Sequence, residues 1–164
     1  MINYVNKLGT IPVGDSNPVR FMGILNTSRE SFYKKSISIS KQRISDAVYR
    51  MEAEGADFID VGGMSTAPYL ATMISEKIEI SRIIKAIKII QQISNLPISV
   101  DTCRAEVAKE VLELGVDIIN DVTGLKYDPM MAKTIEKYCP SLVLCAYSKK
   151  IMTGNQLHNV KQLL

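Results

Sequence analysis

The chain has 164 residues and a mass of 18.2 kDa, which is enough for one domain with a hydrophobic core. Hydrophobic residues make up 46% of the chain and charged residues 23%, a composition that excludes global disorder. The formal net charge of +3, from 20 basic and 17 acidic residues, is too balanced to indicate a protein that binds nucleic acid.

The sequence does not predict a membrane protein or a secreted one. It has no apolar run of about 18 residues, and Met1–Asp15 lacks the basic and apolar regions of a signal peptide. The three cysteines, Cys103, Cys139 and Cys145, form no C-x-x-C pair, and we interpret them as reduced thiols of a cytoplasmic protein. A single histidine, His158, argues against a histidine-rich zinc site and a Ser-His-Asp hydrolase.

Short apolar runs alternate with amphipathic segments from the start of the chain. The run from Val19 to Leu25 predicts a buried strand that ends at Asn26. Ser40 is a suitable N-cap for a helix, because the apolar residues behind it recur at helical spacing. Gly55 stands where this helix should stop.

The same alternation continues through the middle of the chain. Phe58–Val61 predicts a second strand, which the pair Gly62–Gly63 breaks. A long helix with a stripe of isoleucines is expected over Glu76–Ile93. Pro97–Val100 predicts a third strand, and the helix that follows it should stop at Gly115.

Two more strands are expected before a tail without a strong pattern. Asp117–Ile119 and Ser141–Cys145 are the fourth and fifth predicted strands. Between them, Asp128–Pro129 predicts the N-cap and first turn of a helix, and a last helix is predicted near Asn159–Leu164. No domain boundary is visible, so residues 1–164 are expected to form a single domain.

Alternating strands and helices predict an α/β fold with a parallel sheet and right-handed crossovers. The length favours a five-stranded doubly wound sheet, because a closed (β/α)₈ barrel needs about 200–250 residues. The pattern of elements fits five units of an incomplete barrel equally well. Periodicity does not separate these two architectures.

Polar residues follow the carboxyl ends of the predicted strands. Asn26 closes the first strand, and Ser65 and Thr66 follow the second. Asp101 follows the third strand, and Asn120 and Asp121 follow the fourth. Each of these residues also suits a helix cap or a turn. Ligands bind at this edge of parallel α/β sheets, so the convergence of four polar strand ends favours a binding site.

The residue types at this edge suit a flat polar heterocycle and an anion. An asparagine amide both donates and accepts hydrogen bonds, and a carboxylate accepts them from ring N–H and NH₂ groups. Positive charge near the same edge would come from Arg29, Lys34 and Lys35. Neither G-x-x-x-x-G-K-[ST] nor G-x-G-x-x-G occurs, so the common nucleotide-binding loops are not predicted.

Three ordered motifs resemble dihydropteroate synthase, a family of pterin-binding enzymes. They are MGILNTSRESFY at 22–33, DFIDVGGMSTAP at 57–68 and ISVDTCRAEVAKEVLELGVDIINDVTGL at 98–125. The resemblance covers about residues 19–147, and the variants in the first two motifs look most like the archaeal branch. It implies a TIM-barrel-like fold, incomplete, with about five of the eight β/α units.

The resemblance also implies a function in folate or pterin-cofactor biosynthesis. The family joins 6-hydroxymethyl-dihydropterin pyrophosphate to an arylamine, usually p-aminobenzoate, and releases pyrophosphate. Carried over to this chain, it implies that Asn26 is a Mg²⁺ ligand and that Thr66, beside Ser65, contacts the pyrophosphate and the arylamine. Asp101 and Asn120 would hydrogen-bond the pterin ring. The implied catalytic residues are therefore Asn26, Thr66, Asp101 and Asn120.

The chain departs from the family pattern in two respects. Met64 and Ala67 stand where the family usually has Glu and Arg, and a modified arylamine would be one explanation. The family's strands six to eight have no counterpart before Leu164, so we expect no turnover by this chain alone. Three alternatives remain open: a non-catalytic pterin-binding remnant, half of a split enzyme and, ranked lower, a pterin-dependent methyltransferase. A homodimer or the missing C-terminal half would cover the open sheet edges.

Overall fold

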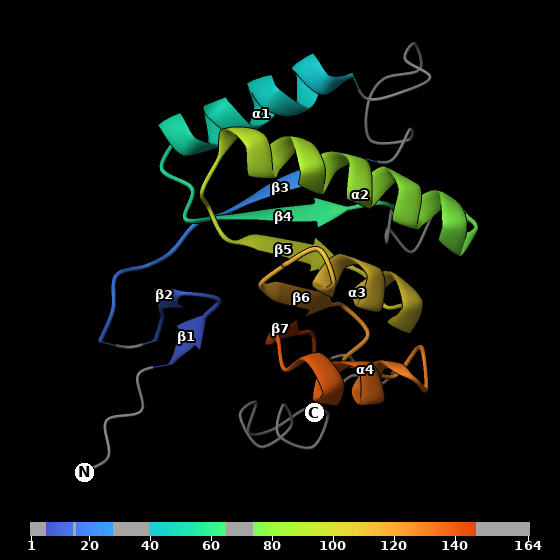
Figure 1. Ribbon diagram of the computed structural model, residues 1–164. Coiled ribbons are helices and arrows are strands. Elements are labelled where there is room, and N and C mark those ends of the chain that lie inside the picture. Colours follow the sequence, from blue (N-terminus) through green and yellow to red (C-terminus); the bar gives the residue numbers. More distant parts are fainter. Residues whose placement is uncertain (1–5, 15, 28–39, 65–73, 147–164) are drawn as a thin grey trace.

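The computed structural model describes residues 6–14, 16–27, 40–64 and 74–146. Its main feature is a parallel sheet of five strands that lie side by side in chain order (Figure 1). These strands are β3 (Met22–Asn26), β4 (Phe58–Gly62), β5 (Ile98–Asp101), β6 (Ile118–Asp121) and β7 (Ser141–Leu144). The helices between them are α1 (Lys41–Ala53), α2 (Glu76–Ile93), α3 (Ala105–Leu112) and α4 (Met131–Tyr138).

The strand order decides between the two predicted architectures. A doubly wound sheet reverses its strand order and carries helices on both faces. Here each new strand is added on the same side of the last one, and consecutive helices pack against each other in a single layer. This is the arrangement of a (β/α) barrel. The prediction of an incomplete barrel is confirmed, and the doubly wound alternative is wrong.

The hydrophobic core lies between the sheet and the helical layer. Leu25, Val61, Val100 and Ile119 occupy one row across the sheet and are buried under the helices. Because side chains alternate along a strand, the rows on either side of this one point to the opposite face. Ile24 lies in such a row and is 68% exposed. The face opposite the helices is therefore open at β3.

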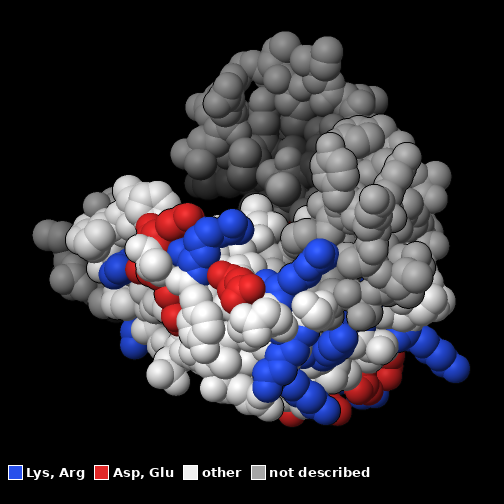
Figure 2. All heavy atoms as spheres, turned by 90° about the horizontal axis from the view of Figure 1, so that it is seen from above, with Lys and Arg blue, Asp and Glu red and all other residues white. Residues whose placement is uncertain are grey.

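The helical layer has a mixed charged surface. Charged side chains of both signs lie on the face of the molecule seen from above (Figure 2). On α2 the exposed positions include Lys77, Lys85 and Lys88, whereas the isoleucine stripe, Ile83, Ile87, Ile89 and Ile90, is buried. No helix in the described ranges is long and apolar enough to span a membrane.

Most predicted helix ends agree with the structure. Ser40 is the N-cap of α1, and its side chain accepts a hydrogen bond from Arg43 N at 3.3 Å. Gly55 follows the helix with a φ of 90°, which is a conformation that suits glycine. The Glu76–Ile93 helix has the predicted bounds. The predicted helix near residues 159–164 lies outside the described residues.

Several predicted boundaries differ from the structure: the third, fourth and fifth strands of the large sheet are shifted by one or two residues, and two further boundaries differ at the first strand and the last described helix. The first strand begins at Met22 instead of Val19, and just before it the backbone N–H of Phe21 donates to the Asp57 side chain at 2.8 Å. The helix expected at Asp128–Pro129 begins two residues later, at Met131. Asp128 nevertheless accepts a hydrogen bond from Met130 N at 2.9 Å, so its side chain still acts at this helix end.

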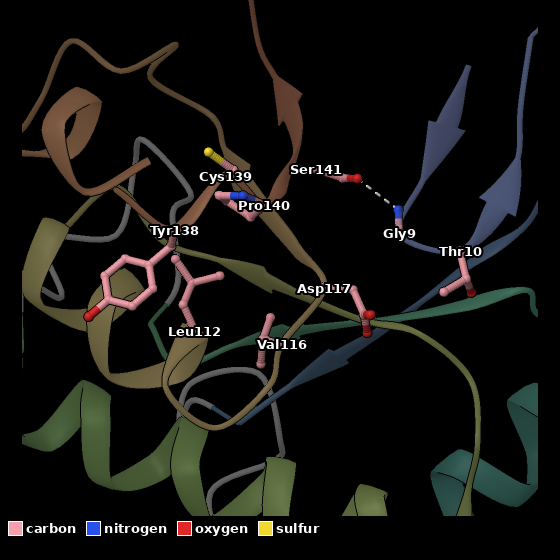
Figure 3. Close-up of a pocket in the computed structure, with 9 residues that line it drawn as sticks. All are labelled: Gly9, Thr10, Leu112, Val116, Asp117, Tyr138, Cys139, Pro140 and Ser141. Atoms are coloured by element: carbon pink, nitrogen blue, oxygen red, sulfur yellow. Dashed lines mark hydrogen bonds between the residues drawn. The ribbon is translucent and has the colours of Figure 1, made fainter. Parts of the chain in front are cut away.

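A small hairpin that the sequence did not indicate lies against the amino end of the large sheet. Its strands are β1 (Lys7–Leu8) and β2 (Ile11–Pro12), which pair antiparallel. Gly9 at the turn has a φ of 57°, and its N–H donates to Ser141 Oγ of β7 at 2.9 Å. Figure 3 shows this bond beside a pocket of about 320 Å³ at the amino ends of β6 and β7.

Candidate functional site

Three of the predicted site residues lie in one row at the carboxyl edge of the sheet. The register pairs Asn26 with Gly62, Gly62 with Asp101, and Asp101 with Asn120. Partners in a parallel register point to the same face. This row shares its face with Ile24 and faces away from the helical layer. The sheet therefore brings Asn26, Asp101 and Asn120 together, as the sequence predicted.

Gly62 leaves room for the side chains on either side of it. A Cβ atom at Gly62 would lie 2.9 Å from Asn26 Oδ1 and 3.9 Å from Asp101 Oδ2. The amide of Asn26 thus leans over the glycine toward the carboxylate. Any larger residue at this position would fill the space between them.

Asp60 is a buried acid that the sequence analysis missed. It lies in the middle of β4, two residues before Gly62, and is 5% exposed. Its Oδ1 accepts a hydrogen bond from Ser99 Oγ at 2.6 Å, and its Oδ2 accepts one from Asn120 Nδ2 at 3.1 Å. Asp60 therefore orients the Asn120 amide. The available signal was an acid inside an apolar strand, since charged residues are seldom buried without a partner.

Asp101 has an unusual electrostatic environment. Its Oδ1 is buried and has no hydrogen-bond partner among the described residues. Burial raises the pKa of Asp101 from its ordinary value of 3.8 to about 7, and nearby negative charges add to this shift. These charges belong to Asp60, Glu79 and Asp121. A buried acceptor without a partner is costly in a folded protein and is characteristic of a site that meets a donor from a ligand.

Asp121 does not belong to this row, although the sequence placed it at the same edge. It is fully buried, and its side chain accepts hydrogen bonds from Thr123 N, Thr123 Oγ1 and Leu125 N. Its role is therefore that of a turn residue. The corresponding interpretation of Asp101 as a cap of α3 is not supported, because Ala105 N is bound by Asp128 instead.

The remaining predicted residues are described only in part. Met64 is partly buried just after β4. The other candidates lie outside the described residues, namely Ser65, Thr66, Ala67, Arg29, Lys34, Lys35 and His158.

The described residues hold no group of three or more His, Cys, Asp or Glu side chains that could bind a metal ion. Magnesium does not require such a group, because it keeps several waters and is often bound by one or two protein oxygens together with substrate phosphates. Asn26 Oδ1, which faces Asp101 across Gly62, is an oxygen of this kind. A single oxygen of this kind is compatible with a Mg²⁺ ion whose other ligands are waters and phosphate oxygens.

Comparisons of the sequence with known proteins agree with this geometry. The family described as "Pterin binding enzyme" matches residues 22–163. The chain is 37% identical to the dihydropteroate synthase of Clostridium beijerinckii over 136 residues, which are 80% of this chain and 49% of that protein. It is 41% identical to the Bacillus subtilis enzyme over 75% of this chain and 43% of that protein. The chain thus spans about half the length of the curated relatives it matches.

Solved structures of dihydropteroate synthases resemble this fold. A dihydropteroate synthase from Clostridium difficile, solved in the presence of pteroic acid, aligns with a TM-score of 0.75 and 31% identity. The alignment covers 99% of this chain and 58% of that one. The Xanthomonas albilineans enzyme, solved with 4-aminobenzoic acid, aligns with a TM-score of 0.63 and 32% identity over 75% of this chain and 44% of that one. The partial coverage agrees with an incomplete barrel.

Proposed function

The chain belongs to the pterin-binding enzyme family, and from this premise we propose that it forms the pterin-binding part of a dihydropteroate synthase-like transferase. The reaction joins 6-hydroxymethyl-dihydropterin pyrophosphate to an arylamine and releases pyrophosphate. The observation that carries the proposal is the row of Asn26, Gly62, Asp101 and Asn120, in which a buried carboxylate oxygen of Asp101 has no partner within the described ranges.

Asp101 and Asn120 are the proposed ligands of the pterin ring. The ring presents N–H and NH₂ donors in one plane, and the free Oδ1 of Asp101 is an acceptor for them. The bond from Asn120 Nδ2 to Asp60 holds the second side chain in a fixed plane. An ionised Asp101 would also stabilise the positive charge that develops on the pterin methylene as pyrophosphate leaves.

Asn26 is the proposed contact on the pyrophosphate side. It would hold a Mg²⁺ ion together with pyrophosphate oxygens, and the chemistry that this ion supplies when bound is neutralisation of the leaving group's charge. In the reaction the methylene C–O bond breaks, the arylamine nitrogen forms the new C–N bond and then loses a proton. Ser65 and Thr66 remain predicted contacts of the pyrophosphate and the arylamine.

We also propose a cytoplasmic location, which the unpaired Cys103, Cys139 and Cys145 support.

Calorimetric titration with 6-hydroxymethyl-7,8-dihydropterin tests this function. We expect saturable binding to the wild-type chain and at least tenfold weaker binding to Asp101→Asn. Gln42→Ala, an exposed change on α1, is a control that should keep the wild-type affinity. Absence of binding to the folded wild-type chain would contradict the proposal.

Half of a split enzyme is the second candidate that the structure favours. Within the described residues, β3 and β7 each pair with only one other strand of the large sheet. The matched segments cover only 49% and 43% of the two relatives' own lengths. We therefore expect no pyrophosphate release by the 164 residues alone, and turnover once a reading frame that encodes the remaining barrel strands is co-expressed. Turnover by the pure chain would contradict this candidate.

A further inference from the structure

A buried ion pair lies next to the proposed pterin site, and neither of its residues is a proposed substrate contact. Arg104 Nη1 donates to Glu79 Oε2 at 2.6 Å, and the two side chains are 10% and 1% exposed. The pair joins the first turns of α2 to the segment between β5 and α3. Hydrophobic residues of similar volume often stabilise a fold as well as a buried ion pair does, so stability alone does not explain it.

The ion pair is bonded directly to the residue that follows Asp101. Thr102 Oγ1 donates to Glu79 Oε1 at 2.9 Å and accepts a hydrogen bond from Arg104 N at 3.3 Å. The backbone N–H of Thr102 donates to Asn120 O at 3.0 Å. These bonds thus hold the chain where it leaves the sheet after Asp101, next to both proposed pterin ligands. They involve the side chain of Glu79 and the residues Thr102 and Arg104.

The same pair also contacts the neighbouring strand end and the start of α2. A Cβ atom at Gly63 would lie 2.9 Å from Glu79 Cγ, so Glu79 packs directly against the residue that follows Gly62. Arg104 Nη2 donates to Ile74 O at 3.0 Å. The two side chains therefore connect the ends of β4 and β5 to α2.

Charge gives the pair a second effect on the site. Asp101 faces negative charges from three elements, which are Asp60 on β4, Glu79 on α2 and Asp121 on β6. The guanidinium of Arg104 is bonded to one of these carboxylates. Without it, Glu79 would be a buried charge with no ionic partner among the described residues, and it would repel an ionised Asp101 more strongly.

We propose that Glu79 and Arg104 are positioning residues of the pterin site, which act through Thr102 to hold Asp101 and Asn120 at the spacing that the pterin ring requires. This assignment rests on the proposed function and deepens it. Neither residue needs to touch the pterin. Loss of the pair should weaken pterin binding, because the segment after β5 then loses side-chain hydrogen bonds that hold it to α2.

The test compares pterin affinity and thermal stability in one set of variants. Arg104→Met and Glu79→Gln should each bind 6-hydroxymethyl-7,8-dihydropterin at least tenfold more weakly than the wild type. Arg104→Lys should lose less affinity than Arg104→Met. A lysine ammonium can pair with Glu79, but it cannot also donate to Ile74 O. Arg20→Met is the matched control, since it breaks an ion pair with Asp57 at the other end of the sheet and should leave affinity within twofold.

Thr102→Val covers the case in which the charge variants do not fold, because it keeps both charges and the side-chain shape. We expect it to bind the pterin three- to tenfold more weakly with a melting temperature near that of the wild type. If the wild type binds and Thr102→Val, or a folded Arg104→Met, binds as tightly as the Arg20→Met control, the positioning role is wrong. If the wild type itself does not bind, the proposed function fails first, and this assignment fails with it.

Discussion

At the scale of single residues, Asp101 shows that the proposed site is maintained at a cost to stability. Its pKa is about 7 in the folded protein because the carboxyl is buried, and an unfolded chain restores the ordinary value of 3.8. The folded state therefore binds its proton more tightly than the unfolded state does. The stability associated with that proton is fully present below about pH 4 and is lost as the pH rises through about 7.

Asp101→Asn should remove this pH dependence, because asparagine has the same shape and no charge. We expect the variant to gain stability relative to the wild type as the pH rises from 4 to 8, by an amount on the order of 3 kcal/mol. Urea unfolding at both pH values measures the change. A difference between the two proteins that is the same at pH 4 and pH 8 would show that Asp101 is not the titrating group.

The adjacent glycines Gly62, at the end of β4, and Gly63, just after it, should respond differently to the same substitution. At Gly62 an added Cβ comes close only to the end of the Asn26 side chain, which can shift, and lies at ordinary contact distance, 3.9 Å, from Asp101 Oδ2. Gly62→Ala should therefore change stability by less than about 1 kcal/mol. At Gly63 the added Cβ lies 2.8 Å from Ile83 Cγ1 in the core, so Gly63→Ala should cost about 1–3 kcal/mol.

Ligand affinity should show the opposite order, with the larger loss of affinity in Gly62→Ala. Gly62→Ala displaces the Asn26 amide and should weaken binding of the pterin pyrophosphate more than binding of the pterin without pyrophosphate. Chemical denaturation and calorimetry on both variants measure the two effects. Equal losses of stability in Gly62→Ala and Gly63→Ala would contradict this difference between the glycines.

At the scale of elements, sequence periodicity predicted every strand of the large sheet and every helix of the layer. It succeeded because the strands appear as short apolar runs and the helices as apolar residues at helical spacing, bounded by residues such as Ser40 and Gly55. It missed the β1–β2 hairpin, whose strands have two residues each and show no repeat. Asp60 was missed for another reason: in sequence it appears as part of a buried strand, and its partners Ser99 and Asn120 are distant in the chain.

Asp128 links two helices through one side chain. Its Oδ2 accepts a hydrogen bond from Ala105 N at the start of α3, and its Oδ1 accepts one from Met130 N just before α4. Asp128→Ala should therefore cost about 2 kcal/mol, roughly twice the usual loss of one cap. Asp128→Asn, which keeps one acceptor, should lose about half as much. Denaturant unfolding measures both, and equal losses in the two variants would contradict the double contact.

At the scale of the whole molecule, the sequence defined the pattern of elements but left the architecture open. A doubly wound sheet and a partial barrel use the same alternation of strands and helices, so periodicity is the same in both. They differ in strand order and in the face that each helix covers, which depend on contacts between distant residues. The ordered motifs carried the information that periodicity lacked.

The open face around β3 should make the chain self-associate. Val19, Phe21 and Ile24 are 80%, 63% and 68% exposed, and β3 is an edge strand of the described sheet. Ile24→Lys places a charge there and should reduce self-association without lowering the melting temperature. Ile78→Lys on α2, where the isoleucine is 47% exposed, is the control. Light scattering over a concentration series measures the effect, and an equal effect of both variants would exclude the β3 edge as its origin.

The bond between Gly9 and Ser141 sets an order of events for a chain that is still being synthesised. The two residues are 132 positions apart, whereas each strand from β4 to β7 can join the one before it as soon as it emerges. Contacts between distant segments form slowly, and domains begin to fold while translation continues. The hairpin is therefore synthesised before any strand of the large sheet, but it is among the last elements to dock, because its contact with β7 forms only after Ser141 has been synthesised.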